Sequence, residues 1–180
     1  MPSVYLNPSN EQNEYIIGGS EEYYMNKIAD AMIPYLQGSG IEVTRSKPGE
    51  SLSKAIAESN AGEYDLYIGL GSLAAPFFAT GATQGPIVLY NGDSSEGKQA
   101  AEIVSDNFEA IYPRPTLVKT IPNQTLSELK DTEATSILIE VGYHNNTSDA
   151  YWIRDNIDAI GRILALGVSQ YFAIPFVRPQ

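Results

Sequence analysis

The chain has 180 residues, of which 43% are hydrophobic and 18% charged, so it can bury the core of one globular domain. Its 22 acidic residues outnumber 11 basic ones, and the net charge of −11 argues against nucleic acid or an anionic membrane as a partner. The sequence contains no cysteine, which excludes disulfides and thiolate chemistry. It also shows no export signal and no apolar run long enough to span a membrane, so we expect a soluble protein.

The first part of the chain alternates between strand and helix patterns. Residues 3–6 are typical of a short strand, and residues 20–36 place apolar side chains at helical spacing behind Ser20, a preferred helix cap. Pro34 should bend the last turn of that helix. Further along, the pattern predicts strands at 41–44 and 64–70 and a short helix at 51–60.

The same alternation continues to the end of the chain. Strands are predicted at 86–90, 116–120 and 136–143. Helices are predicted at 95–112 and 147–172, and a capping box at Thr125 predicts a short helix between them. Strands alternating with helices predict one α/β domain over residues 1–180. We expect three layers: a mainly parallel, twisted sheet of about six strands, with helices on both faces.

Ligands of such folds bind beyond the carboxyl ends of the strands, which directs attention to the loops at 7–19, 71–83, 91–95 and 142–148. Glu140 lies near the end of the most apolar strand, as either a catalytic carboxylate or a strand-end residue bonded to loop amides. Glu21 lies in the first turn of a helix, where the macrodipole alone favours a negative charge. His144, the only histidine, is either a site residue or a solvated loop residue.

Five segments in order resemble the zinc-dependent N-acetylmuramoyl-L-alanine amidases, which cleave peptidoglycan between the muramic acid lactyl group and L-alanine. The resemblance covers nearly the whole chain and agrees with the fold class predicted above. The segments are "VYLNPSN", "EEYYMNKIADAMIPYLQGSGIEVTR", "SLSKAIAESNAGEYDLYIGLGS", "ILIEVGYHNN" and "WIRDNIDAIGRILALGVSQYF".

The resemblance implies a zinc ion held by two histidines and a glutamate, with a second glutamate that handles protons. It assigns Glu21 to the ligand glutamate and Glu140 to the catalytic glutamate. The two histidines fall on Asn10 and Gly71, and Leu73 stands where the family has an asparagine. Loss of two of three ligands should lower zinc affinity by many orders of magnitude, because these bonds supply most of the binding energy.

Two interpretations follow from the resemblance. In the first, the chain is an amidase-like pseudoenzyme of cell-wall metabolism, with zinc absent or weakly bound, that recognises muropeptide or a protein partner. In the second, it is an active zinc amidohydrolase with an altered ligand set, in which His144, four residues after Glu140, substitutes for a lost histidine. Both interpretations imply a cell-wall-directed or extracellular location.

Overall fold

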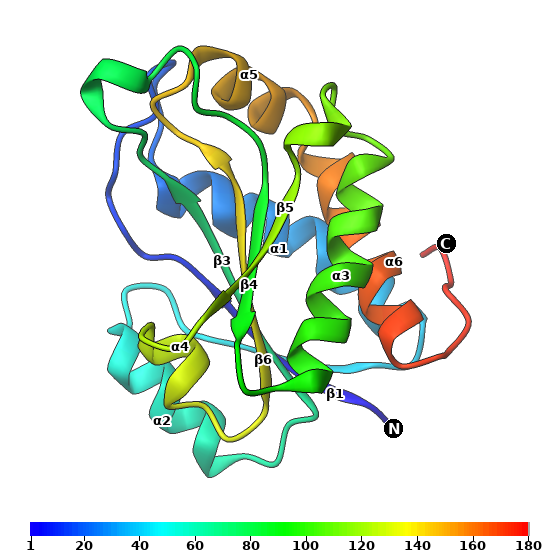
Figure 1. Ribbon diagram of the computed structural model, residues 1–180. Helices are drawn as coiled ribbons and strands as arrows, with labels where there is room; N and C mark the ends of the chain where they lie inside the picture. Colours follow the sequence, from blue (N-terminus) through cyan, green and yellow to red (C-terminus); the bar gives the residue numbers. More distant parts are fainter. Residues whose placement is uncertain (180) are drawn as a thin grey trace.

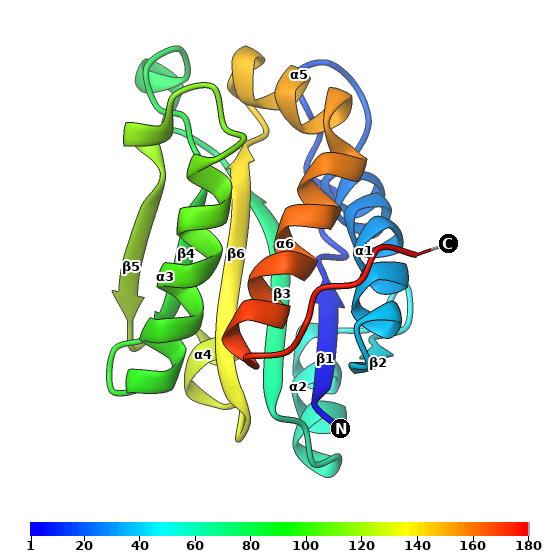
Figure 2. The ribbon, with the colours of Figure 1, turned by 90° about the vertical axis from the view of Figure 1, so that its right-hand side faces the viewer.

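The computed structural model describes residues 1–179, in which a six-stranded sheet is covered by helices on both faces (Figures 1 and 2). The strand order in the sheet is β2-β1-β3-β6-β4-β5. The strands are β1 (Ser3–Pro8), β2 (Glu42–Arg45), β3 (Leu66–Leu73), β4 (Ile87–Asn91), β5 (Lys119–Asn123) and β6 (Thr135–Tyr143). The single three-layer α/β architecture expected from the sequence is therefore confirmed.

The sheet is mainly parallel, as predicted, but two of its strands run in the opposite direction. The neighbouring strands β2, β1, β3 and β6 are parallel, whereas β4 is antiparallel to β6 and carries β5 beside it in its own direction. Ile87, at the amino end of β4, therefore lies opposite Glu140 of β6. The loop at 91–95 consequently lies at the amino ends of the parallel strands, opposite to their carboxyl ends. The prediction that this loop belongs to the ligand-binding end of the sheet was wrong.

The helices form two layers of unequal size. Figure 2 shows α1 (Glu21–Gly38), α6 (Ile157–Tyr171) and α3 (Ser95–Glu109) side by side over one face of the sheet. The shorter helices α2 (Leu52–Ala61) and α4 (Ser127–Lys130) lie on the other face, and α5 (Thr147–Asp155) follows the carboxyl end of β6 (Figure 1). Because α2 and α4 are short, part of that second face remains open.

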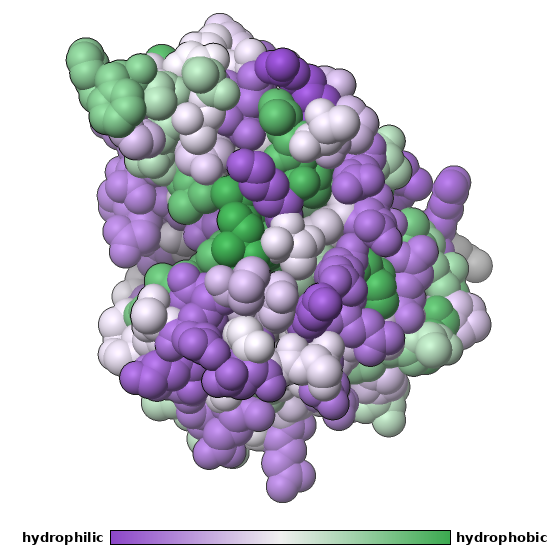
Figure 3. Space-filling model, in the orientation of Figure 1, coloured by the Kyte–Doolittle hydropathy of each residue, from purple (hydrophilic) through white to green (hydrophobic). Residues whose placement is uncertain are grey.

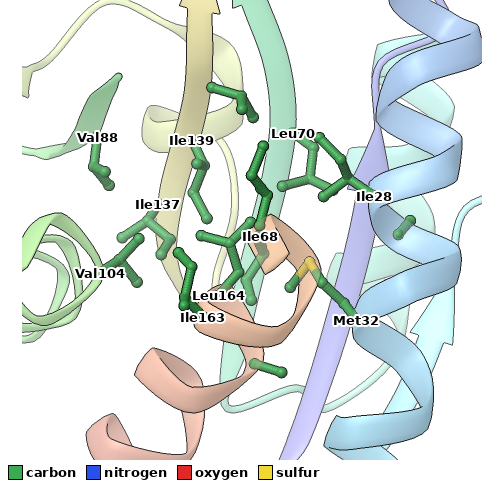
Figure 4. Close-up of a cluster of buried hydrophobic side chains, with 14 of the residues drawn as sticks. Ile28, Met32, Ile68, Leu70, Val88, Val104, Ile137, Ile139, Ile163 and Leu164 are labelled. Atoms are coloured by element: carbon green, nitrogen blue, oxygen red, sulfur yellow. The ribbon is translucent and has the colours of Figure 1, made fainter. Parts of the chain in front are cut away.

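The main core lies between the sheet and the layer of three helices. Figure 4 shows branched aliphatic side chains from β3 and β6 meeting those of α1 and α6, with Ile68, Ile139 and Leu164 among those that are fully buried. At Gly161 the two helices approach so closely that a Cβ would stand 2.5 Å from that of Ala31. This approach requires glycine, and it fixes α6 against α1.

Most element boundaries shift by one to three residues from the sequence prediction, and three elements differ in a way that has a structural reason. The closing helix is interrupted at Asn156, whose side-chain amide donates to the carbonyl of Trp152 and competes with helical bonding. Strand β5 begins only at Lys119, because residues 115–117 form a 3₁₀ turn. Helix α4 begins at Ser127 without the expected cap, since the Asn123 side chain accepts the backbone N–H groups of Thr125 and Leu126 instead.

Candidate functional site

A cleft of about 670 Å³ opens on the face that α2 and α4 leave partly uncovered, at the carboxyl ends of β1 and β3. In Figure 3 an apolar patch lies in this region, framed by polar surface. The cleft combines an apolar floor with carboxyl groups. Its apolar lining includes Leu52, Leu70, Leu73, Ile87, Leu89, Ile121, Leu126 and Leu138, and its acidic lining comes from Glu11, Glu21, Glu50, Glu128 and Glu140.

Two glycines of β3 make room for carboxyl groups in the cleft. Gly69 and Gly71 lie two residues apart, so they share a face of the strand. A Cβ on Gly71 would stand 2.9 Å from Oε2 of Glu140 and 3.2 Å from Oε1 of Glu21. A Cβ on Gly69 would stand 2.6 Å from Oε1 of Glu128. The carboxyl groups therefore occupy space that side chains at these two positions would need.

Glu21 begins α1, and its carboxylate is turned into the fold. Its Oε1 accepts the backbone N–H of Ser72 at 2.9 Å, and its Oε2 accepts the side-chain amide of Asn13 at 2.7 Å. The cap of the helix is supplied separately by Ser20, which accepts the N–H of Tyr23. Glu21 is buried, so its position reflects these specific partners as well as the favourable helix dipole.

Glu140 reaches the same space from β6. Its Oε2 is buried and has no hydrogen-bond partner among residues 1–179, so the alternative of a carboxylate bonded to loop amides does not describe this atom. Burial raises the pKa of Glu140 to about 8, and the nearby negative charges of Glu21 and Glu128 act in the same direction. Glu140 is therefore largely a neutral acid at pH 7.

Glu128, on α4, is a third carboxyl group of the cleft that the sequence did not point to. It accepts the hydroxyl of Tyr67 at 2.7 Å and the side-chain amide of Asn7 at 3.2 Å. Asn7 in turn accepts the hydroxyl of Ser46 at 2.7 Å. Burial raises the pKa of Glu128, and the two hydrogen bonds oppose that change. In the sequence this residue reads as the glutamate of a capping box, which gave no sign of the cleft.

Asn10 and His144 both lie near the cleft but have other partners. The Asn10 side chain lines the cleft, where its amide donates to the carbonyl of Glu50 at 2.8 Å and its oxygen accepts the N–H of Gly49 at 3.2 Å. His144 is buried, with its Nδ1 3.1 Å from the hydroxyl of Ser72. Burial lowers the pKa of His144, which favours the neutral imidazole. The interpretation of His144 as a solvated loop residue is wrong.

The loop that follows β3 carries two exposed aromatic side chains. Phe77 and Phe78, 95% and 91% exposed, lie on the loop between β3 and β4, which projects at the upper left of Figures 1 and 3. The base of this loop is held by Asn145, which makes two hydrogen bonds to the backbone of Ala75, and by Asp149, which accepts the N–H of Gly85 at 2.8 Å. The loop is thus anchored at both ends.

Solved N-acetylmuramoyl-L-alanine amidases share the three-layer α/β fold of this chain. The AmiC2 amidase of Nostoc punctiforme shares it with a TM-score of 0.84 over 96% of this chain and 97% of that one, at 15% identity. The Ami1 amidase of Mycobacterium smegmatis gives 0.82 over 96% and 97%, at 14% identity. The CwlD amidase of Clostridioides difficile, solved in complex with the GerS lipoprotein, gives 0.77 over 96% and 99%, at 15% identity.

The sequence itself defines the family. The model described as N-acetylmuramoyl-L-alanine amidase matches residues 10–170, and the chain belongs to this family. No curated protein sequence matches the chain. Within residues 1–179 no helix has the length and apolar character needed to cross a membrane.

The side chains present do not fit the three-ligand zinc site that the family resemblance implies. Gly71 offers no donor atom, and the amide of Asn10 is used in the loop that contains Gly49. His144 does not line the cleft, and its Nδ1 already has a partner. Over the described part of the chain, no three histidine, cysteine, aspartate or glutamate side chains are arranged to hold a metal ion.

Proposed function

We propose that this chain is a single amidase-like domain of peptidoglycan metabolism in which zinc-dependent hydrolysis is lost or strongly reduced and the cleft serves to bind muropeptide or a protein partner. The observation that carries the proposal is the pairing of Gly71 with two carboxyl groups. Where the resemblance implies an imidazole, Glu140 and Glu21 approach the bare backbone. A catalytic zinc ion normally has three protein ligands, and here only Glu21 remains of the implied set.

In this proposal Glu140 keeps the place of the family's catalytic glutamate without a metal beside it. Asn10 and Gly71 mark the positions of the two replaced histidines. Family membership also favours a cell-wall-directed or extracellular location. That CwlD was solved with the GerS lipoprotein supports a protein partner as one form of binding.

The alternative is an active amidase with an altered ligand set. One observation favours it: Ser72 contacts Glu21 through its backbone N–H and His144 through its hydroxyl. A single residue therefore bridges the only imidazole and the remaining zinc ligand of the family. For this alternative, His144 must leave Ser72 and turn into the cleft. The proposal without zinc requires no such rearrangement.

Zinc content and hydrolysis together decide between these functions. We expect purified protein to contain substoichiometric zinc and to release no free L-alanine amino termini from peptidoglycan. One tightly held zinc per chain together with turnover would instead establish the active alternative. Elemental analysis and a muropeptide cleavage assay on the same preparation provide both measurements.

A gain-of-function variant tests the assignment of the two positions. We expect Asn10→His combined with Gly71→His to bind more zinc than the wild type, since Glu21 and the surrounding frame remain. The Glu140 carboxyl must move to admit the new side chain at position 71, because even a Cβ there would stand 2.9 Å from its Oε2. A folded double variant that binds no additional zinc shows that these positions are not the lost ligands.

A further inference from the structure

The cleft is acidic without any basic counterpart. Among the described residues that line it there is no lysine, arginine or histidine. Glu50 is paired with Lys54 at 3.0 Å, which leaves the carboxyl groups of Glu11, Glu21, Glu128 and Glu140 without a salt-bridge partner among the described residues. A ligand with a carboxylate or phosphate at this place would be repelled, whereas a cation would be attracted.

A second observation concerns hydrogen bonding. Oε2 of Glu140 is a buried acceptor with no donor in the described part of the chain, and Oε1 of Glu21 faces the same space above Gly71. A buried acceptor left unsatisfied costs free energy, and a ligand that supplies an N–H removes that cost. An ammonium group carries three donors and a positive charge, so it meets both requirements at once.

Much of the remaining lining of the cleft is apolar. Ile87 is paired with Glu140 across the sheet, and Leu89 is paired with both Leu138 and Ile121. These side chains and Leu73 line the cleft. A bare metal ion would make no use of this floor, and the carboxyl groups are not arranged to hold one. A protonated amine attached to a small apolar body uses both the charged end and the floor.

We propose that the cleft binds the free, protonated amino terminus of a short peptide, with the ammonium group between Glu21 and Glu140 above Gly71 and the first side chains on the apolar floor. This inference rests on the proposed function, because it names the ligand of a cleft that no longer holds zinc. The inferred ligand is a peptide whose amino terminus is free, as opposed to a peptide whose terminal nitrogen is part of an amide bond.

Two peptides without charged side chains and with an amidated carboxyl terminus provide the test. Trialanine amide has one charge, at its amino terminus, and N-acetyl-trialanine amide has none. We expect the first to bind the full chain in an NMR titration or by calorimetry, with affinity that falls as salt is added, and the second to bind at least about tenfold more weakly. Equal binding of the two peptides, or no binding of either, would overturn the inference.

Variants of the two carboxyl groups locate the binding site. Glu21→Gln should weaken binding of trialanine amide by about tenfold, the effect expected for one charge-assisted hydrogen bond. Glu140→Gln should weaken it as well, because an ammonium group beside Glu140 favours the ionised carboxylate over the neutral acid of the free protein. Glu109→Gln, on the exposed end of α3, is the matched control and should bind as the wild type does. Thermal unfolding checks that each variant is folded, and wild-type affinity in both cleft variants would refute the site. Zinc stoichiometry tests the proposed function separately, so either idea can fail alone.

Discussion

Replacing Glu140 by glutamine should change how the stability of the protein depends on pH. The ordinary pKa of a glutamate is 4.5, and burial with two neighbouring carboxyl groups raises that of Glu140 to about 8. Between these values the folded state holds a proton that the unfolded state releases, so the wild type loses stability as pH rises. The full difference corresponds to about 5 kcal/mol, reached above pH 8. Glutamine has the same shape and does not titrate.

The measurement is urea unfolding of wild type and Glu140→Gln between pH 5 and pH 9. We expect the variant to gain stability relative to the wild type throughout this range, by a total of several kcal/mol. Glu109→Gln, which alters an exposed carboxyl, should follow the wild type in parallel. A constant difference between Glu140→Gln and wild type across the range would refute the account of Glu140 as a buried neutral acid.

Three further variants test the supports of the site. Tyr67→Phe removes the hydroxyl that donates to Glu128 at 2.7 Å, and it should cost about 1–3 kcal/mol of unfolding free energy in a denaturant titration. Asp149→Ala removes a buried carboxylate that accepts the hydroxyl of Tyr112 and two backbone N–H groups, so we expect a loss of about 3–5 kcal/mol and faster proteolysis of the loop that carries the two exposed aromatics. Ser20→Ala removes the cap of α1 and should lower stability by about 1 kcal/mol by thermal unfolding; an unchanged midpoint would contradict the capping role.

The fold was predictable because its elements have strong local patterns. The long amphipathic stripe behind Ser20 and the apolar run ending at Glu140 each became the predicted element, α1 and β6. The reversed direction of β4 was missed, although the sequence held a signal for it. No helix of useful length separates β3 from β4, whereas a parallel crossover normally contains one.

The site was less predictable than the fold, because it depends on which side chains face one another. Glu21 and Glu140 were singled out, and the structure brings both carboxyl groups to the place where a Cβ on Gly71 would stand. Glu128 was not, since a capping glutamate and a cleft glutamate look the same in sequence. The partner of His144, the hydroxyl of Ser72, is 72 residues away along the chain, and no local pattern reports such a contact.

The position of β6 has a consequence for how the chain reaches its folded state. β6 is the last strand to be synthesised, yet it is the one that joins β3 to β4 in the finished sheet. Before Thr135 leaves the ribosome, the sheet can exist only as two separate pieces, β2-β1-β3 and β4-β5, each with an unsatisfied inner edge. A nascent or truncated chain that ends before β6 therefore exposes two strand edges that invite pairing with other chains, and completion of the last 46 residues removes both of them.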